Sequence, residues 1–221
     1  GLHSKQLAES FAVYGVDLRN HGASFQDDEL NYQVMAEDLK KLLIHLQIER
    51  CFLVGHSMGG KVAMQLAQTD PQIIEKLVVV DIAPVSYSST ADGHLNVMDG
   101  MESLDFSSIS NRKDADEQLA KFVADEATRS FILTNLVREG EIYKWRINLP
   151  AIRKNYDRLR EKPIGDEIFS KPVLFIRGGN SNYIQSSQQE EILKLFPEAK
   201  VKTVMEAGHW VHAEKPQLVL K

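Results

Sequence analysis

The 221-residue sequence contains a single cysteine, Cys51, so no internal disulfide can form. Such sparing use of cysteine fits a reducing compartment. Long hydrophobic runs are also missing: no stretch approaches the roughly 18 apolar residues of a membrane helix. The sequence shows no basic start followed by an apolar stretch, which would indicate a signal peptide. We therefore expect a cytoplasmic protein without a membrane partner.

An excess of positive charge is absent as well. Lys and Arg number 26 against 31 Asp and Glu, which gives a net charge of −5 and a pI of about 5.8. Proteins that bind nucleic acid mainly through its phosphates need a basic surface, so nucleic acid is not an expected partner. The sequence has no Cys/His cluster with zinc-ligand spacing, no GxGxxG and no Walker loop. We therefore expect neither a metal nor another cofactor.

Apolar segments typical of strands alternate with helical patterns along the chain. The expected strands are residues 11–16, 51–54, 77–80, 173–176 and 199–204. Several lack polar alternation, as expected of strands covered on both faces of a parallel sheet. Between the first two, apolar residues at helical spacing predict a helix that Asn31 could cap. The pattern predicts an α/β fold with a doubly wound, mostly parallel sheet, whose ligands bind outside the carboxyl ends of the strands.

Residues 84–163 interrupt this alternation with polar and helical segments. We interpret them as a helical cap inserted into a core made of residues 1–83 and 164–221, placed where the cap could cover the site. The alternative is a run of peripheral helices without a gating role.

The segment "FLVGHSMGGKVAMQLA" (52–67) predicts a strand, a sharp turn and a helix, with Ser57 at the turn. Glycine stands two residues before and two after the serine, at Gly55 and Gly59. We expect both to remove side chains that would clash in so tight a turn. Such a nucleophile elbow presents the serine hydroxyl above the end of the sheet. The alternative is a chance glycine-serine turn, but the flanking strand and helix favour a nucleophile.

A serine nucleophile needs a base, and the base needs a third group to orient it. His209 follows the last expected strand in a glycine-containing loop, which makes it the candidate base. Asp81 directly follows an apolar strand, where a desolvated carboxylate requires a hydrogen-bond donor, and it is the candidate acid. The usual acid position, after the strand 173–176, holds Ser181 instead. If Asp81 only caps its strand, Asp166 or Glu206 would have to serve as the acid.

Six segments together are more selective than the serine motif alone. They are "VDLRNHGAS", "VGHSMGGKVAM", "VVVDIAPV", "WRINLP", "RGGNSNYI" and "AGHWVHAEKP". In this order and spacing the chain resembles the YbfF-type esterases of the α/β-hydrolase superfamily over nearly its whole length. The resemblance implies hydrolysis of short acyl esters or thioesters, small-molecule substrates, with Ser57 as nucleophile, His209 as base and Asp81 as acid. It also implies that Ser181 joins the hydrogen-bond network of the histidine.

The oxyanion donors are less complete. The N–H of Met58, the residue after the nucleophile, is one expected donor. Related hydrolases take a second donor from an upstream HG-containing loop. Either Gly1 and Leu2 are remnants of that loop, which makes Leu2 the candidate second donor, or the sequence lacks residues there. The expected substrate-binding side chains are Trp145, Arg146, Asn148 and Tyr183, although packing is the more common role of such a tryptophan.

Three functions fit this sequence. The first is a cofactor-independent hydrolase of carboxylic esters or thioesters that forms an acyl-serine. The second is a binding protein with the hydrolase fold, in which ligand binding rather than turnover matters. The third is a carbon-carbon bond hydrolase that uses the same three residues. The first is favoured because every chemical role has a candidate residue.

Overall fold

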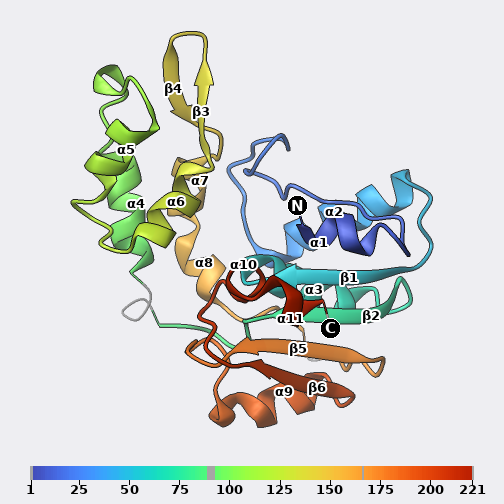
Figure 1. The fold of residues 1–221 in the computed structure, drawn as a ribbon. Coiled ribbons are helices and arrows are strands. Elements are labelled where there is room, and N and C mark those ends of the chain that lie inside the picture. Colours follow the sequence, from blue (N-terminus) through green and yellow to red (C-terminus); the bar gives the residue numbers. More distant parts are fainter. Residues whose placement is uncertain (1, 89–92, 166, 221) are drawn as a thin grey trace. The chain divides into compact units, whose positions relative to one another are not determined.

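Four parallel strands form the main sheet of the protein (Figure 1), in the order β1-β2-β5-β6. The structure is a computed structural model and describes residues 2–88, 93–165 and 167–220. The strands span Cys51–His56 (β1), Ile74–Val80 (β2), Val173–Gly178 (β5) and Ala199–Val204 (β6). Four of the five expected strands are thus confirmed, together with the mostly parallel α/β sheet.

The chain divides into two units. The first unit comprises Gly1–Val16, Asn31–Ser86 and Glu161–Lys221 and contains the sheet. Its helices are α1 (Leu2–Leu7), α2 (Tyr32–His45), α3 (Met58–Thr69), α9 (Gln189–Leu195), α10 (Val211–Glu214) and α11 (Pro216–Val219), with a 3-10 turn, η2 (Ser186–Gln188). Helix α3 packs against β1 and β2, and α2 packs against α3.

Local signals explain where these elements begin and how they are held. The expected cap is confirmed: the Asn31 side chain accepts a hydrogen bond from the N–H of Val34 at 3.0 Å. Near the carboxyl ends of the strands, an apolar cluster joins the sheet to α10. Its buried members are Val80, Ile176, Val204, Ala207 and Val211. Burying a valine or isoleucine side chain stabilises the fold by about 1.5–3 kcal/mol, and the cluster fixes the loop before α10 against the strand ends.

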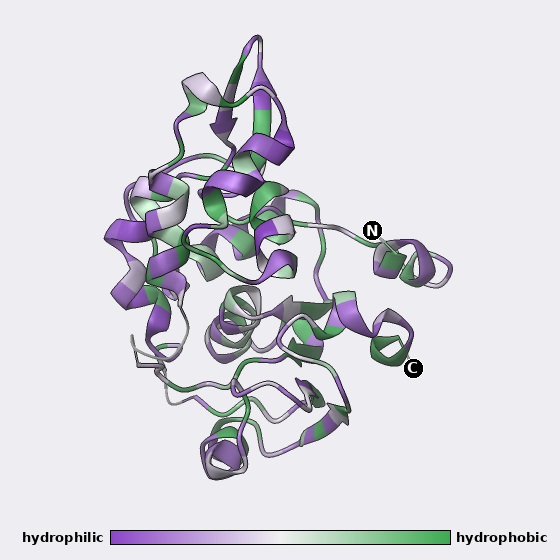
Figure 2. Cartoon of the chain, turned by 60° about the vertical axis from the view of Figure 1, so that its left-hand side comes forward, coloured by the Kyte–Doolittle hydropathy of each residue, from purple (hydrophilic) through white to green (hydrophobic). Residues whose placement is uncertain are grey.

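The second unit comprises Asp17–Leu30 and Tyr87–Arg160. It contains α4 (His94–Glu102), η1 (Phe106–Ser108), α5 (Arg112–Leu119), α6 (Glu126–Leu133), α7 (Leu149–Lys154), α8 (Tyr156–Arg160) and the antiparallel hairpin of β3 (Leu136–Glu139) with β4 (Ile142–Trp145). It has its own apolar core, including Met98, Leu119 and Leu136. Polar and apolar residues alternate along the helices of both units (Figure 2), as expected of elements with one buried face.

Residues 17–30 belong to the second unit because side-chain amides attach them to α7. Asn148 Nδ2 donates to Asn20 Oδ1 at 3.0 Å, and the N–H of Asn148 donates to the Asn20 carbonyl at 2.9 Å. Asn155 Nδ2 donates to the Asp28 carbonyl at 2.9 Å. The division predicted from the sequence assigns residues 17–30 to the core and gives the inserted segment the bounds 84–163. The gating role of that segment stays a prediction.

The strand expected at residues 11–16 is wrong: this segment lies outside every helix and strand of the described residues. Phe11, Val13, Tyr14 and Val16 are 39–56% exposed, and Phe11 packs edge-on against Phe52 with ring centroids 5.6 Å apart. Aromatic and β-branched residues favour strands only where neighbouring strands and a covering layer receive them. In the described residues no strand pairs with this segment, so its composition alone misled the prediction.

A histidine fixes the end of β1 to the loop before α10. His56 Nε2 donates a hydrogen bond to the backbone carbonyl of His209 at 2.8 Å, and its ring centroid lies 4.5 Å from that of His212. Burial, reinforced by the neighbouring His209 and His212, lowers the pKa of His56 from about 6.5 to about 3. Burial, followed by the neighbouring His3 and His209, also lowers the pKa of His212. Both histidines therefore favour the neutral form in the folded chain.

This pKa shift predicts a loss of stability on acidification. The unfolded chain binds a proton at His56 below pH 6.5, whereas the folded chain resists that proton down to about pH 3. The contribution of His56 is therefore complete above pH 6.5 and declines as the pH falls, by at most about 1.4 kcal/mol per pH unit. His56→Gln, which keeps an N–H donor, should make the fall in unfolding free energy between pH 6.5 and 4.5 less steep.

Urea unfolding at a series of pH values measures this slope. His45→Gln, at the exposed end of α2, is the matched control and should behave as the unmodified protein. Parallel pH dependences for the unmodified protein and His56→Gln would contradict the prediction.

Candidate functional site

Ser57 occupies a strained turn between β1 and α3. Its φ of 51° and ψ of −121° are rarely adopted by residues other than glycine. The turn is held at both ends: the Ser57 N–H donates to the Val80 carbonyl at 3.0 Å, and the Ser57 carbonyl accepts from the N–H of Lys61 at 3.1 Å. Strain of this kind is retained where the surrounding structure fixes it, often at functional sites.

One of the two glycines of the motif is required for the expected reason. A Cβ on Gly55 would lie 2.2 Å from the carbonyl oxygen of Gly59, so no side chain fits there. The expectation for Gly59 is wrong, because a Cβ on that residue would meet nothing within 4 Å. The second close approach belongs to Gly60, whose Cβ would lie 2.6 Å from Ile82 Cγ2. The second glycine requirement thus comes from packing of α3 against the segment that follows β2.

His209 connects the hydroxyl of Ser57 to a carboxylate. His209 Nε2 lies 2.9 Å from Ser57 Oγ, and His209 Nδ1 lies 2.8 Å from Asp81 Oδ2. A carboxylate only accepts, so Nδ1 carries the proton and Nε2 can accept the hydrogen of the serine hydroxyl. The His209 side chain is 18% exposed. The structure therefore brings together the residues that the sequence named as nucleophile, base and acid.

Asp81 is completely buried, with a side-chain exposure of 0%. Its Oδ1 accepts the N–H of Gly178 at 2.8 Å. Its Oδ2 accepts from His209 Nδ1 and from the Ser181 hydroxyl, which is in short contact. These donors replace the water that a buried charge loses. Like Ser57, Asp81 has a positive φ of 51°, while its N–H keeps a 2.8 Å hydrogen bond to the Ile176 carbonyl.

Ser181 and Tyr183 lie in the loop after β5. The Ser181 hydroxyl donates to Asp81 and accepts the N–H of Tyr183 at 3.2 Å. The Tyr183 ring stacks on the His209 ring, with centroids 4.0 Å apart and an interplanar angle of 28°. Ser181 thus contacts the carboxylate that is hydrogen-bonded to His209, and Tyr183 contacts the histidine itself.

One alternative acid, Glu206, is poorly placed for this role. The Glu206 side chain is 85% exposed and lies 3.7 Å from Lys215 Nζ. Asp166 lies outside the described residues. Of the proposed carboxylates that the structure describes, Asp81 is the one hydrogen-bonded to His209.

Two aromatic neighbours of His209 had no assigned part in the sequence-based site. The His56 ring lies 4.7 Å from the His209 ring, in addition to its hydrogen bond to the His209 carbonyl, and the Trp210 ring lies 5.5 Å away, edge-on. In the sequence, His56 directly precedes Ser57 and Trp210 directly follows His209, which was the only sign of their place in the site. This adjacency could not show that the segment with Ser57 contacts the segment with His209.

The two candidate oxyanion donors occupy helix starts. Met58 is the first residue of α3, directly after Ser57, and Leu2 is the first residue of α1 and is 47% exposed. Both remain predictions as donors.

Three of the four predicted substrate-binding residues lie in the second unit, where they have structural contacts. Trp145 Nε1 donates to the Met101 carbonyl at 2.9 Å. The N–H of Arg146 donates to the Asn135 carbonyl at 2.8 Å. Asn148 caps α7 by accepting from the N–H of Ala151. Their roles in substrate binding stay predictions.

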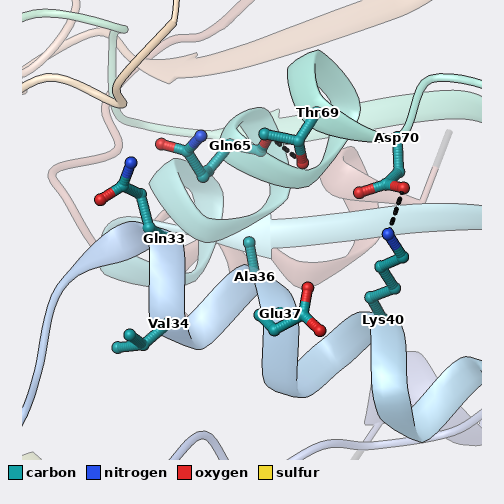
Figure 3. Close-up of a pocket in the computed structure, with 8 residues that line it drawn as sticks. All are labelled: Gln33, Val34, Ala36, Glu37, Lys40, Gln65, Thr69 and Asp70. Carbon is teal, nitrogen blue, oxygen red and sulfur yellow. Dashed lines mark hydrogen bonds and ion pairs between the residues drawn. The ribbon is translucent and has the colours of Figure 1, made fainter.

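A separate pocket lies between α2 and α3 (Figure 3). It is lined by Gln33, Val34, Ala36, Glu37, Lys40, Gln65, Thr69 and Asp70. Lys40 Nζ lies 2.7 Å from Asp70 Oδ1, and this hydrogen bond raises the pKa of Lys40. None of the candidate site residues lines this pocket.

Two absences hold for the residues that the structure describes. Within them, no three His, Cys, Asp or Glu side chains are grouped so as to hold a metal ion. Within the same residues, no helix has both the length and the apolar character needed to cross a bilayer.

The arrangement can transfer the hydroxyl proton of Ser57 to His209. A hydroxyl hydrogen-bonded to a neutral imidazole loses its proton to that imidazole when it attacks an electrophile, and the buried carboxylate stabilises the imidazolium. The geometry therefore suits attack on a carbonyl carbon by Ser57.

The chain is similar to known hydrolases. Residues 4–216 match the family model described as alpha/beta hydrolase fold. Over 210 residues the chain is 44% identical to the mouse protein named sn-1-specific diacylglycerol lipase ABHD11, covering 93% of this chain and 68% of that protein. It is 36% identical to Escherichia coli esterase YbfF over 224 residues, covering 100% of this chain and 84% of the esterase.

A solved structure of a marine microorganism esterase superposes with a TM-score of 0.94 at 36% identity, covering 98% of this chain and 85% of the esterase. The resemblance to the YbfF-type esterases is thereby confirmed. The chain belongs to the α/β-hydrolase family, among its esterase- and lipase-type members.

Proposed function

We propose that the protein hydrolyses short acyl carboxylic esters or thioesters through an acyl-serine, with Ser57, His209 and Asp81 as the catalytic residues. The observation that carries this proposal is the continuous chain of contacts from Ser57 Oγ through the His209 ring to the buried Asp81, at 2.9 and 2.8 Å. A binding protein would not need a nucleophile, a base and an acid in reach of one another.

The first half of the reaction forms the acyl-serine. Ser57 Oγ attacks the acyl carbonyl carbon while His209 Nε2 takes the hydroxyl proton. The N–H of Met58 holds the developing oxyanion, with Leu2 as the proposed second donor. The tetrahedral intermediate then breaks its bond to the alcohol or thiol, which receives the proton from His209.

The second half repeats these steps with water. His209 removes a proton from water, the resulting hydroxide attacks the acyl-serine, and the acid product leaves as Ser57 recovers its proton. Asp81 accepts from Nδ1 throughout, so the imidazole keeps Nε2 directed at the serine. The proposed role of residues 84–163 is that of a helical cap with a gating function.

The first test is labelling of Ser57. An activated serine attacks phosphorus as it attacks a carbonyl carbon, so an alkyl fluorophosphonate should modify Ser57 and abolish turnover of aryl esters. Ser57→Ala should lose both labelling and turnover. Tryptic mass spectrometry locates the adduct, and Ser186→Ala, in the 3-10 turn η2, is the control. An adduct on another residue, or turnover that survives Ser57→Ala, would contradict the assignment.

A substrate panel separates the alternatives. Aryl esters, acyl-CoA thioesters of graded chain length and a diacylglycerol, chosen because of the name of the mouse relative, are compared with Ser57→Ala as blank. Ester turnover supports the proposal. Ligand binding without turnover favours the binding protein, and cleavage confined to carbon-carbon substrates favours the third function.

The second test compares the loss of activity on changing Asp81, which accepts from His209 Nδ1, with the loss on changing Ser181, which donates to Asp81. Asp81→Asn should lower kcat by about 10⁴-fold, as the corresponding change does in a serine protease, because an amide favours the wrong imidazole tautomer. Ser181→Ala leaves Asp81 with two donors, Gly178 and His209, so a loss of about tenfold or less is expected. Steady-state kinetics measure both, and circular dichroism checks folding. The reverse ranking would assign the acid role elsewhere.

A further inference from the structure

The loop after β5 contacts both the acid and the base of the proposed site. Its Ser181 hydroxyl donates to Asp81 Oδ2, and its Tyr183 ring lies against His209. The N–H of Tyr183 in turn donates to Ser181 Oγ at 3.2 Å. These contacts form a ring of four residues. Tyr183 donates to Ser181, Ser181 donates to Asp81, Asp81 accepts from His209, and His209 stacks on Tyr183.

The Tyr183–His209 contact has the geometry of a stacked pair. The centroids are 4.0 Å apart and the planes are inclined by 28°, which places the imidazole over the face of the phenol ring. The face of an aromatic ring carries negative partial charge and attracts a cation above it. The imidazole becomes such a cation when it takes the serine proton, so this contact strengthens during the reaction.

We propose that Tyr183 is a positioning residue for His209: its ring fixes the plane of the imidazole and stabilises the imidazolium that forms during catalysis. This inference rests on the proposed function. It gives Tyr183 a role in proton transfer, beyond the substrate contact that the sequence suggested.

Of the groups around His209, the tyrosine and Asp81 are the ones that stabilise the imidazolium. The titratable or charged side chains near it are Asp81, His56, His212 and Glu214, whose Oε2 accepts from the N–H of Gly208 at 2.8 Å. Burial keeps His56 neutral, and burial also lowers the pKa of His212. Neither histidine attracts a positive charge on His209.

The test compares Tyr183→Phe, which keeps the ring, with Tyr183→Leu, which removes it. Losing a stabiliser of the cation makes the imidazole harder to protonate, so the acid limb of kcat/KM should move to lower pH by about half a unit in Tyr183→Leu. In the same variant kcat should fall roughly three- to tenfold with KM changed less than about twofold, because the contact strengthens in the transition state. Tyr183→Phe, which keeps the ring, should restore the acid limb and most of kcat relative to Tyr183→Leu.

A control variant and a second ring deletion complete the kinetic comparison. Tyr14→Leu removes a tyrosine that is 56% exposed in the same unit and should change nothing. Tyr183→Met provides a second ring deletion if the leucine variant does not fold. A raised KM at constant kcat, an unmoved acid limb, or equal losses in the phenylalanine and leucine variants would overturn the inference.

A substrate-free measurement separates this inference from the proposed function. The ring current of Tyr183 should shift the His209 ring protons upfield in the NMR spectra of the unmodified protein and Tyr183→Phe, and this shift should disappear in Tyr183→Leu. The titration midpoint of the His209 ring should fall in Tyr183→Leu as the kinetic limb does. If the protein cleaves no ester, the proposed function fails although these NMR shifts remain; if the midpoint is unchanged, the role of Tyr183 fails although esters are cleaved.

Discussion

The buried carboxylate of Asp81 is the constraint on which the candidate site depends. At 0% exposure it has no bulk water to solvate its charge, and an unpaired carboxylate there would cost several kcal/mol. Its donors come from three places in the chain: the end of β5 at Gly178, the following loop at Ser181, and the loop before α10 at His209. Satisfying one charge therefore brings β2, β5 and the loop after β6 to one point.

The same strand ends carry the backbone strain. Ser57 and Asp81 both have a φ of 51°, and both keep a ladder-type hydrogen bond to the next strand, from Ser57 to Val80 and from Asp81 to Ile176. The ladder fixes the position of each residue while the unusual φ turns its side chain out of the strand direction. A Cβ on Gly178 would lie 2.1 Å from the carbonyl oxygen of Gly208, so glycine there lets the His209 loop approach the acid.

Local signals predicted much of this arrangement. Asp81 was found because a carboxylate after an apolar strand needs donors, and Asn31 because a cap residue preceded a helical pattern. Residues 11–16 failed because strand propensity does not reveal whether a neighbouring strand exists. The stacking of Tyr183 on His209, and the attachment of Asn20 to Asn148, join segments far apart in the chain. No local pattern encodes such contacts.

The environment of His209 shows how one histidine of a cluster can become a cation without being repelled by its neighbours. His56 donates from Nε2 to the carbonyl of His209, which holds that loop, and its pKa of about 3 keeps it uncharged. A charged His56 at a centroid distance of 4.7 Å would oppose the charge that the base acquires. Burial of His56 thus serves two ends. It fixes the loop through a neutral donor, and it leaves Asp81 as the charged partner bound to the imidazole.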